Sequence, residues 1–172
     1  MKTLIAMTFP SKDGAADVLH KLHKLQNEYL IDLDDAVIVT RNEDGKIKLK
    51  QSVNLVSSGA WNGAFWGGLI GMIFTGPLGL VVVGGLGAGF GALTGSLADY
   101  GINDNFIKQL SEDMKPCCSG LFILVRSMTQ DKVLEELQGV GGKVITTSLP
   151  SDVEDKLRTA IQKSDTAESI QK

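Results

Sequence analysis

The chain has 172 residues, of which 22% are charged and 43% hydrophobic, and its formal net charge is −3. This length fits one ordinary domain with an additional segment, and the mildly acidic balance without a long basic run argues against a nucleic-acid partner. The two cysteines, Cys117 and Cys118, are adjacent and too few for a disulfide framework. We interpret them as ordinary thiols of a reducing compartment, with a redox-active pair as the alternative.

The first segment begins with a predicted strand and helix. The apolar run 4–9 predicts a strand that stops at Pro10, and it is too short for a secretory signal peptide. Ser11 is placed to cap the helix that follows. His20 and His23 lie off its apolar face, and we expect them to be exposed to solvent rather than bound to a metal. The apolar face of this helix is predicted to pack on the core. It consists of Ala15, Val18, Leu19, Leu22, Leu25 and Tyr29.

A predicted strand hairpin completes this segment. Residues 35–41 predict a buried strand, and residues 42–45, Asn-Glu-Asp-Gly, predict the turn that ends it. A half-exposed partner strand follows, because apolar residues alternate with polar ones from Ile47 to Leu55. We interpret the acidic cluster just before the buried strand as a solvated connection, because no residues with ligand or catalytic spacing complete it: Asp32, Asp34 and Asp35.

The dominant feature of the sequence is a run of 48 residues without a charged side chain, from Gln51 to Ala98. Glycines recur at every fourth position within it, so each series lies along one helical face and allows another backbone to approach closely. We predict two helical arms, 57–74 and 78–97, which form a hairpin with its corner at Pro77. The helix-packing glycines are Gly59, Gly63, Gly67 and Gly71 in the first arm and Gly87, Gly91 and Gly95 in the second.

The length of the two arms is compatible with a membrane. The second arm would span about 30 Å, enough to cross a bilayer, whereas the first would span about 27 Å and begins with two serines. A hairpin buried between copies of a soluble protein is the alternative, because apolar surface of this extent is not tolerated on a soluble monomer. Lipid, other copies of the chain, or both must therefore cover the hairpin.

Three residues beside or within the hairpin are candidate membrane or packing contacts. Trp61 and Tyr100 would lie at the same level of the hairpin, as interfacial aromatic anchors do. The Asn62 amide is a candidate for an interhelical hydrogen bond, with a plain position at the headgroup level as the alternative. Lysines at 46, 48 and 50 favour cytoplasmic ends for both arms.

The remaining residues predict further helices and strands. The run 121–125 is apolar throughout and predicts a central strand covered on both faces. Residues 143–147 predict another strand. Helices are expected after residue 103, after Thr129 and from Ser151, the second of them ending at Gly139. The core-facing residues of these helices are Phe106, Ile107, Leu110, Val133, Leu134, Leu137, Val153, Leu157, Ala160 and Ile161.

The fold class expected from this order is α+β. Without the hairpin, the first six elements read βαββαβ, the order of a ferredoxin-like sandwich, with additional αβα elements at the C-terminal end. Residues 1–56 and 99–163 would be the two parts of this α+β domain. Residues 57–98 would be the inserted glycine-zipper hairpin, and residues 164–172 a flexible tail.

Several stretches resemble a bacterial family of predicted membrane proteins of unknown function. The stretches are Ala-Asp-Tyr-Gly-Ile at 98–102, Leu-Phe-Ile-Leu-Val-Arg at 121–126, Asp-Lys-Val-Leu-Glu-Glu-Leu at 131–137 and Gly-Gly-Lys-Val-Ile at 141–145. Together with the glycine hairpin, they extend the resemblance over nearly the whole chain. The resemblance implies an α+β domain interrupted by a glycine-zipper insertion and a location in a membrane. It supplies no catalytic residue.

The sequence itself favours a protein that is not an enzyme. It contains no Ser/His/Asp set, no metal cluster and no phosphate-binding loop, and the glycines at 84–89 lie inside an apolar helix without the lysine of such a loop. We therefore expect no cofactor. The first hypothesis is a membrane-associated homo-oligomer in a bacterial inner membrane, assembled through glycine-zipper helices, with its α+β domain facing the cytoplasm. The alternative is a cytoplasmic, self-assembling ring or shell, and fewer features support a pore former or a small-ligand binder.

Overall fold

The computed structural model describes residues 3–51, 65–74, 102, 104–147 and 150–162. The chain divides into two compact units. One comprises Met1–Val53 and Met114–Lys172, and the other comprises Asn54–Asp113. We call these the sheet unit and the inserted unit.

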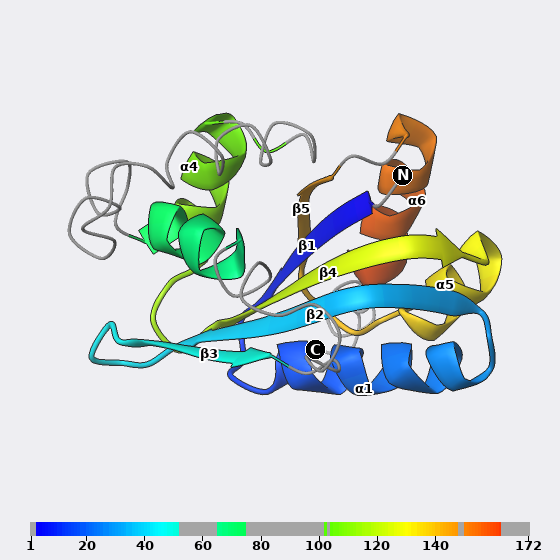
Figure 1. Cartoon of the computed structure of the whole chain (residues 1–172), viewed down its shortest axis with the longest axis horizontal. Coiled ribbons are helices and arrows are strands. Elements are labelled where there is room, and N and C mark those ends of the chain that lie inside the picture. Colours follow the sequence, from blue (N-terminus) through cyan, green and yellow to red (C-terminus); the bar gives the residue numbers. More distant parts are fainter. Residues whose placement is uncertain (1–2, 52–64, 75–101, 103, 148–149, 163–172) are drawn as a thin grey trace, which may run out of the picture. The chain divides into compact units, whose positions relative to one another are not determined.

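The sheet unit contains a five-stranded sheet with the order β3-β2-β4-β1-β5, in which every neighbouring pair is antiparallel (Figure 1). The α+β class is therefore confirmed. Strand β3 lies at one edge, and β4 lies between β1 and β2. The strands are β1 (Thr3–Phe9), β2 (Ile31–Arg41), β3 (Ile47–Gln51), β4 (Ser119–Met128) and β5 (Lys143–Thr147).

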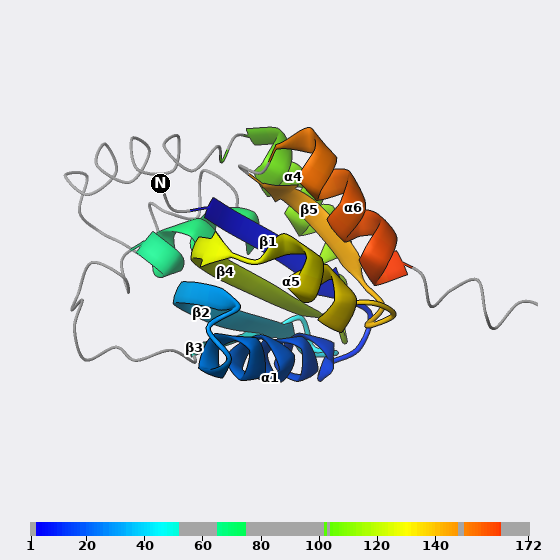
Figure 2. The same ribbon diagram turned by 90° about the vertical axis from the view of Figure 1, so that its right-hand side faces the viewer.

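Helices α1 (Gly14–Asn27), α5 (Gln130–Glu136) and α6 (Ser151–Gln162) lie along one side of the strands (Figure 2). Their apolar faces share one buried cluster with alternate residues of the sheet, including Ile5, Leu121 and Ile123. The core-facing residues expected on α6 are buried as predicted. On α5, Val133 is buried and Leu134 is half-buried, and the buried Leu137 caps this helix, which ends before the predicted Gly139. This cluster is the core of the sheet unit.

The central strand β4 is buried on both faces, as its continuous apolar sequence predicts. Leu121 and Ile123 belong to the core cluster, while Phe122 and Leu124, which point to the opposite face, are 1% and 6% exposed. A strand whose side chains are buried on both faces cannot alternate between polar and apolar residues. That requirement explains why this strand carries the longest apolar run of the sheet unit.

The turn between β2 and β3 is the hairpin that the sequence predicts. The Asn42 amide donates to the Lys46 carbonyl at 2.8 Å, and Gly45 has φ +78°. Leu49 on β3 is 52% exposed, in agreement with a half-exposed partner strand at the sheet edge.

Tyr29 was expected on the buried face of α1, and this expectation is wrong. The helix ends two residues earlier, and Tyr29 has φ +59° and is 95% exposed. The Tyr29 amide donates to the Gln26 carbonyl, and the Leu30 amide donates to the Leu25 carbonyl. These two bonds are those of a Schellman motif, in which the residue at the left-handed position is usually glycine. Helical periodicity cannot continue through such a termination.

The inserted unit contains helix α4 (Asp104–Asp113) and a helical segment at residues 65–74. Phe106 and Leu110 on α4 are buried and Ile107 is half-buried, in accordance with the predicted apolar side. Residues 65–74 lie within the first predicted arm of the glycine hairpin, and the second arm, 78–97, lies outside the described residues.

Candidate functional site

The described helical segment at 65–74 is the one part of the uncharged stretch whose side chains can be assigned to faces. Its bulky side chains Phe65, Trp66, Leu69, Ile70 and Ile73 are all buried. The rings of Phe65 and Trp66 make an edge-to-face contact with their centroids 5.1 Å apart. Apart from Phe74, which is half-buried, the large apolar residues of this segment are therefore already covered within the chain.

Two glycines of the same segment, Gly67 and Gly71, lie on a different face, whereas Gly68 is buried. Gly67 is exposed and Gly71 is half-buried, and a four-residue spacing places both on one side of the helix. A Cβ atom added at Gly67 would meet no atom within 4 Å. This glycine face, formed by Gly67 and Gly71, could accept the close approach of another helix backbone.

The other predicted packing and anchor residues cannot be placed relative to this face. Gly59, Gly63, Gly87, Gly91 and Gly95 lie outside the described residues, as do Trp61, Asn62 and Tyr100. Their roles as packing glycines, interfacial anchors and interhelical hydrogen-bonding group stay predictions. Among the helices that the structure describes, none combines the length and the apolar character needed to cross a bilayer.

The acidic cluster is part of strand β2, not a connection between helix and strand as expected. The pairing of β2 with β4 is irregular at two steps, Asp32/Leu33 and Leu33/Asp35. Arg126 on β4 forms ion pairs with Asp32, at 3.7 Å, and with Asp34. The two-residue alternation of Ile31 and Leu33 with the aspartates was the signal that the strand begins earlier.

Asp35 of this cluster is only 3% exposed, and its Oδ1 atom accepts a hydrogen bond from the Ala36 amide at 2.8 Å. A buried carboxylate is often part of a metal or acid-base site. Among the described residues, however, no group of three His, Cys, Asp or Glu side chains could hold a metal ion. The acidic cluster therefore forms no metal site in the described residues, and we regard the ion pairs of Arg126 with Asp32 and Asp34 as a structural link between β2 and β4.

The two histidines are both accessible to some degree, and among the described residues neither belongs to a group of three side chains that could hold a metal ion. His20 is exposed and His23 is half-buried. Burial, followed by repulsion from His20, lowers the pKa of His23 below its ordinary value. A lowered pKa keeps the imidazole neutral at physiological pH.

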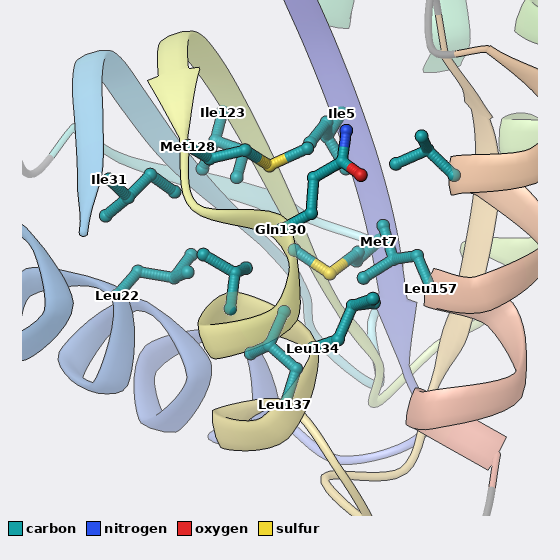
Figure 3. A pocket seen from close by; sticks show the side chains of 12 residues that line it. Ile5, Met7, Leu22, Ile31, Ile123, Met128, Gln130, Leu134, Leu137 and Leu157 are labelled. Atoms are coloured by element: carbon teal, nitrogen blue, oxygen red, sulfur yellow. The ribbon is translucent and has the colours of Figure 1, made fainter.

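A small cavity lies inside the sheet unit between α1, α5, α6 and the sheet. Figure 3 shows Met7, Met128 and Leu137 pointing towards the same space, and Gln130 is the one polar side chain among the lining residues. The cavity volume is about 20 Å³, close to that of a single water probe. Such a volume is typical of imperfect packing beneath a short helix and does not hold a small-molecule ligand.

Comparison with known proteins gives one match. Residues 60–162 match the model of a family described as "Protein of unknown function (DUF1269)". No curated protein and no solved structure matches this chain. The matched range contains the glycine face, α4 and the C-terminal half of the sheet unit.

Proposed function

Because this chain belongs to the DUF1269 family, whose description assigns no activity, we propose a function from its own residues. The protein is a non-enzymatic, membrane-associated homo-oligomer. Its copies associate through the glycine faces of the inserted unit, and its sheet unit faces the cytoplasm of a bacterial cell at the inner membrane. Its partners are other copies of itself and membrane lipid.

The observation that carries this proposal is the exposure of Gly67 on a helical segment whose bulky apolar residues are buried. A glycine inside a helix costs about 1 kcal/mol relative to alanine. That cost is offset if a second helix packs against the glycine, since helices associate in lipid through small residues. The 48 consecutive uncharged residues around Gly67 add to this support, because charged side chains are costly inside a bilayer.

We also propose that the sheet unit is a ferredoxin-like sandwich. The antiparallel order β2-β4-β1-β5 supports this assignment, together with α1 in the connection from β1 to β2 and α5 in the connection from β4 to β5. In this assignment β3 is an additional edge strand, and the inserted unit lies between β3 and β4. Both ends of the insertion then leave the same sheet.

A fractionation experiment tests the membrane proposal. We expect the full chain, expressed in bacteria, to remain in the membrane pellet after carbonate washing and to require detergent for release. In mild detergent the particle should contain more than one copy. Release by carbonate, or a single copy in detergent, would contradict the proposal.

A variant tests whether the glycine face mediates association. Gly67→Leu adds a bulky side chain at the exposed glycine and should reduce the particle to smaller species. Ala16→Leu is the matched control, because Ala16 is an exposed small residue on a helix of the sheet unit. Unchanged particle size in Gly67→Leu would exclude this glycine from the contact.

A soluble ring or shell is the second candidate. The feature that favours it is the first predicted arm, 57–74, which is shorter than the second arm and begins with two serines. In such an assembly the hairpins would cover one another instead of contacting lipid. A large, discrete particle in the cytosol, seen by gel filtration and negative-stain microscopy without detergent, would support it over the membrane form.

A further inference from the structure

Cys117 and Cys118 lie in the turn that leads from the inserted unit into β4. The sheet unit resumes at Met114, and the two cysteines follow within four residues. Neither is in a disulfide. The turn follows closely after one of the two boundaries between the units, which lies between Asp113 and Met114.

Backbone hydrogen bonds hold the turn against the end of β2. The Cys117 amide donates to the Arg41 carbonyl at 2.9 Å, and the Arg41 amide donates to the Cys118 carbonyl at 3.1 Å. The Arg41 side chain adds a third bond, from Nη1 to the Met114 carbonyl at 2.8 Å. The conformation of the cysteine pair and the position of the β2 end are thus linked.

The two thiols differ in their accessibility. Cys117 is half-buried and has φ +68°, a left-handed conformation that residues other than glycine seldom adopt. Cys118 is only 5% exposed, and its thiol donates to the Lys115 carbonyl. Such backbone strain is often found at sites with a function. The accessible, strained thiol is the one that an external reagent can reach first.

We propose that Cys117 and Cys118 are a reversible redox pair that closes to a vicinal disulfide, with Cys117 as the attacking thiol and Cys118 as the resolving thiol. The oxidant is a low-molecular-weight disulfide.

The reaction has two exchange steps. The Cys117 thiolate attacks one sulfur of the small disulfide, whose S–S bond breaks, and one small thiolate leaves. Cys118 then loses its proton to solvent and attacks the Cys117 sulfur, which displaces the second small thiolate. The protein loses two electrons and two protons overall, and one small disulfide is reduced to two thiols.

The resulting disulfide is expected to be easily reduced. Adjacent Cα atoms are about 3.8 Å apart across a trans peptide, whereas disulfides usually join Cα atoms about 4.4–6.8 Å apart. Strained disulfides have more oxidising potentials and are the labile, regulatory ones. Ring closure must also change the torsion angles of the turn, which weakens its hydrogen bonds to Arg41.

The test uses the full chain and glutathione disulfide as the probe. After incubation and alkylation with N-ethylmaleimide, the tryptic peptide 109–126, which contains both cysteines, should have lost two hydrogens and carry no alkyl group. Dithiothreitol should restore both alkylation sites. Two alkylated thiols after incubation, a stable glutathione adduct or disulfide-linked dimers would each overturn the proposal.

Single substitutions assign the two roles. Cys118→Ser should stop at a stable glutathione adduct on Cys117, whereas Cys117→Ser should react at least about tenfold more slowly, because Cys118 is buried. Cys118→Ala serves for the same assignment if the serine variant does not give the circular dichroism spectrum of the wild type. Equal adduct formation in both single variants would overturn the assignment of roles.

Hydrogen exchange tests the structural consequence. The Arg41 amide, which is bonded to the Cys118 carbonyl in the reduced turn, should exchange faster after oxidation. Amides near the middle of β4, such as that of Ile123, are the internal control and should keep their rates. An unchanged Arg41 rate in the oxidised protein would show that the pair does not affect the end of β2.

Discussion

The Oγ atom of Ser119, at the start of β4, accepts a hydrogen bond of 3.0 Å from the amide of Ala15 in the first turn of α1, although 104 positions separate the two residues. The same hydroxyl donates to the Ser11 carbonyl at 2.7 Å. Asp13, the residue at the N-cap, makes no capping hydrogen bond through its side chain. The Ser11 hydroxyl, expected as the cap, accepts from the Gly14 amide at 3.0 Å, and a residue from the second half of the chain satisfies the next amide of the helix start.

Ser119→Ala should lower the free energy of unfolding by about 1–3 kcal/mol, because it leaves the buried Ala15 amide without a partner and removes the hydrogen bond to the Ser11 carbonyl. Urea unfolding followed by circular dichroism measures this change. Ser127→Ala, an exposed serine on the same strand, is the matched control and should stay within about 0.5 kcal/mol of wild type. Equal effects of the two substitutions would show that the Ser119 bonds contribute nothing specific.

Tyr29→Gly should stabilise the sheet unit by roughly 0.5–1 kcal/mol. The left-handed conformation costs a residue with a Cβ atom about 1–2 kcal/mol, and the greater backbone entropy of unfolded glycine cancels part of the gain. No packing is lost, since Tyr29 is 95% exposed. Tyr29→Ala keeps the strain and should leave the urea midpoint close to wild type, so a rise in that variant would contradict this explanation.

Gly142→Ala should be clearly more harmful than Gly141→Ala. An added Cβ at Gly142 would lie 2.7 Å from a ring carbon of Phe9 and 2.8 Å from the Thr8 carbonyl oxygen, whereas at Gly141 it would meet nothing within 4 Å. Both glycines have positive φ, so Gly141→Ala isolates the backbone strain of about 1–2 kcal/mol. We expect a loss of about 3 kcal/mol or more for Gly142→Ala, measured by urea unfolding.

Stability should fall as the pH is lowered through 6.5, the ordinary pKa of histidine, because burial and His20 lower the pKa of folded His23. Between the folded and unfolded pKa values the unfolded chain binds more protons, so the free energy of unfolding rises with pH in that window. Urea midpoints at pH of about 5.5 and 7.5 measure the slope. His23→Gln should reduce the slope more than His20→Gln, and the reverse order would contradict burial as the main cause.

Lys48 and Lys50 should contribute to the capture of anionic membranes if the proposed membrane association is correct. Both are exposed on β3 and precede the uncharged stretch, whereas Lys46 pairs with Asp44 at 3.2 Å. Each lysine near an anionic surface contributes about 1 kcal/mol, or roughly fivefold in binding. Flotation with vesicles containing phosphatidylglycerol should therefore show weaker binding for the double Lys→Gln variant.

The control for this experiment is the double substitution of Lys12 and Lys156 by Gln, which removes the same charge from exposed positions elsewhere. Binding by the β3 variant should also depend less on salt. Equal losses for both double variants would indicate a general charge effect rather than a role of β3. Carbonate resistance of the β3 variant shows separately whether insertion itself still occurs.

Local sequence patterns predicted most elements of the sheet unit. The apolar runs 4–9 and 121–125 arise from strands that bury both faces, and the apolar stripes of α1 and α6 arise from helices that pack on a core. These apolar runs and stripes can be recognised in the sequence because buried positions recur over several helical turns or several successive strand residues. The early start of β2 was missed, since aspartates seldom occupy strands, and two of them are stabilised there by Arg126.

The position of β4 in the sheet and the exposure of Gly67 could not be predicted from such patterns. The pairing of β4 with both β1 and β2 depends on contacts between residues 79 or more positions apart, and periodicity does not encode which strands are neighbours. Spacing showed that Gly67 and Gly71 share a face, but not whether that face is buried. Only the packing of Trp66 and its neighbours decides that question.

The place of β4 between β1 and β2 also sets an order of events during synthesis. The ribosome releases β1, α1, β2 and β3 first, then the whole uncharged stretch, and only afterwards the strand that joins β1 to β2. The sheet therefore cannot close while the apolar residues emerge, and they must meet lipid, a chaperone or another chain before their own domain exists. Slow translation beyond residue 98 should consequently favour insertion, and fast translation should favour aggregation.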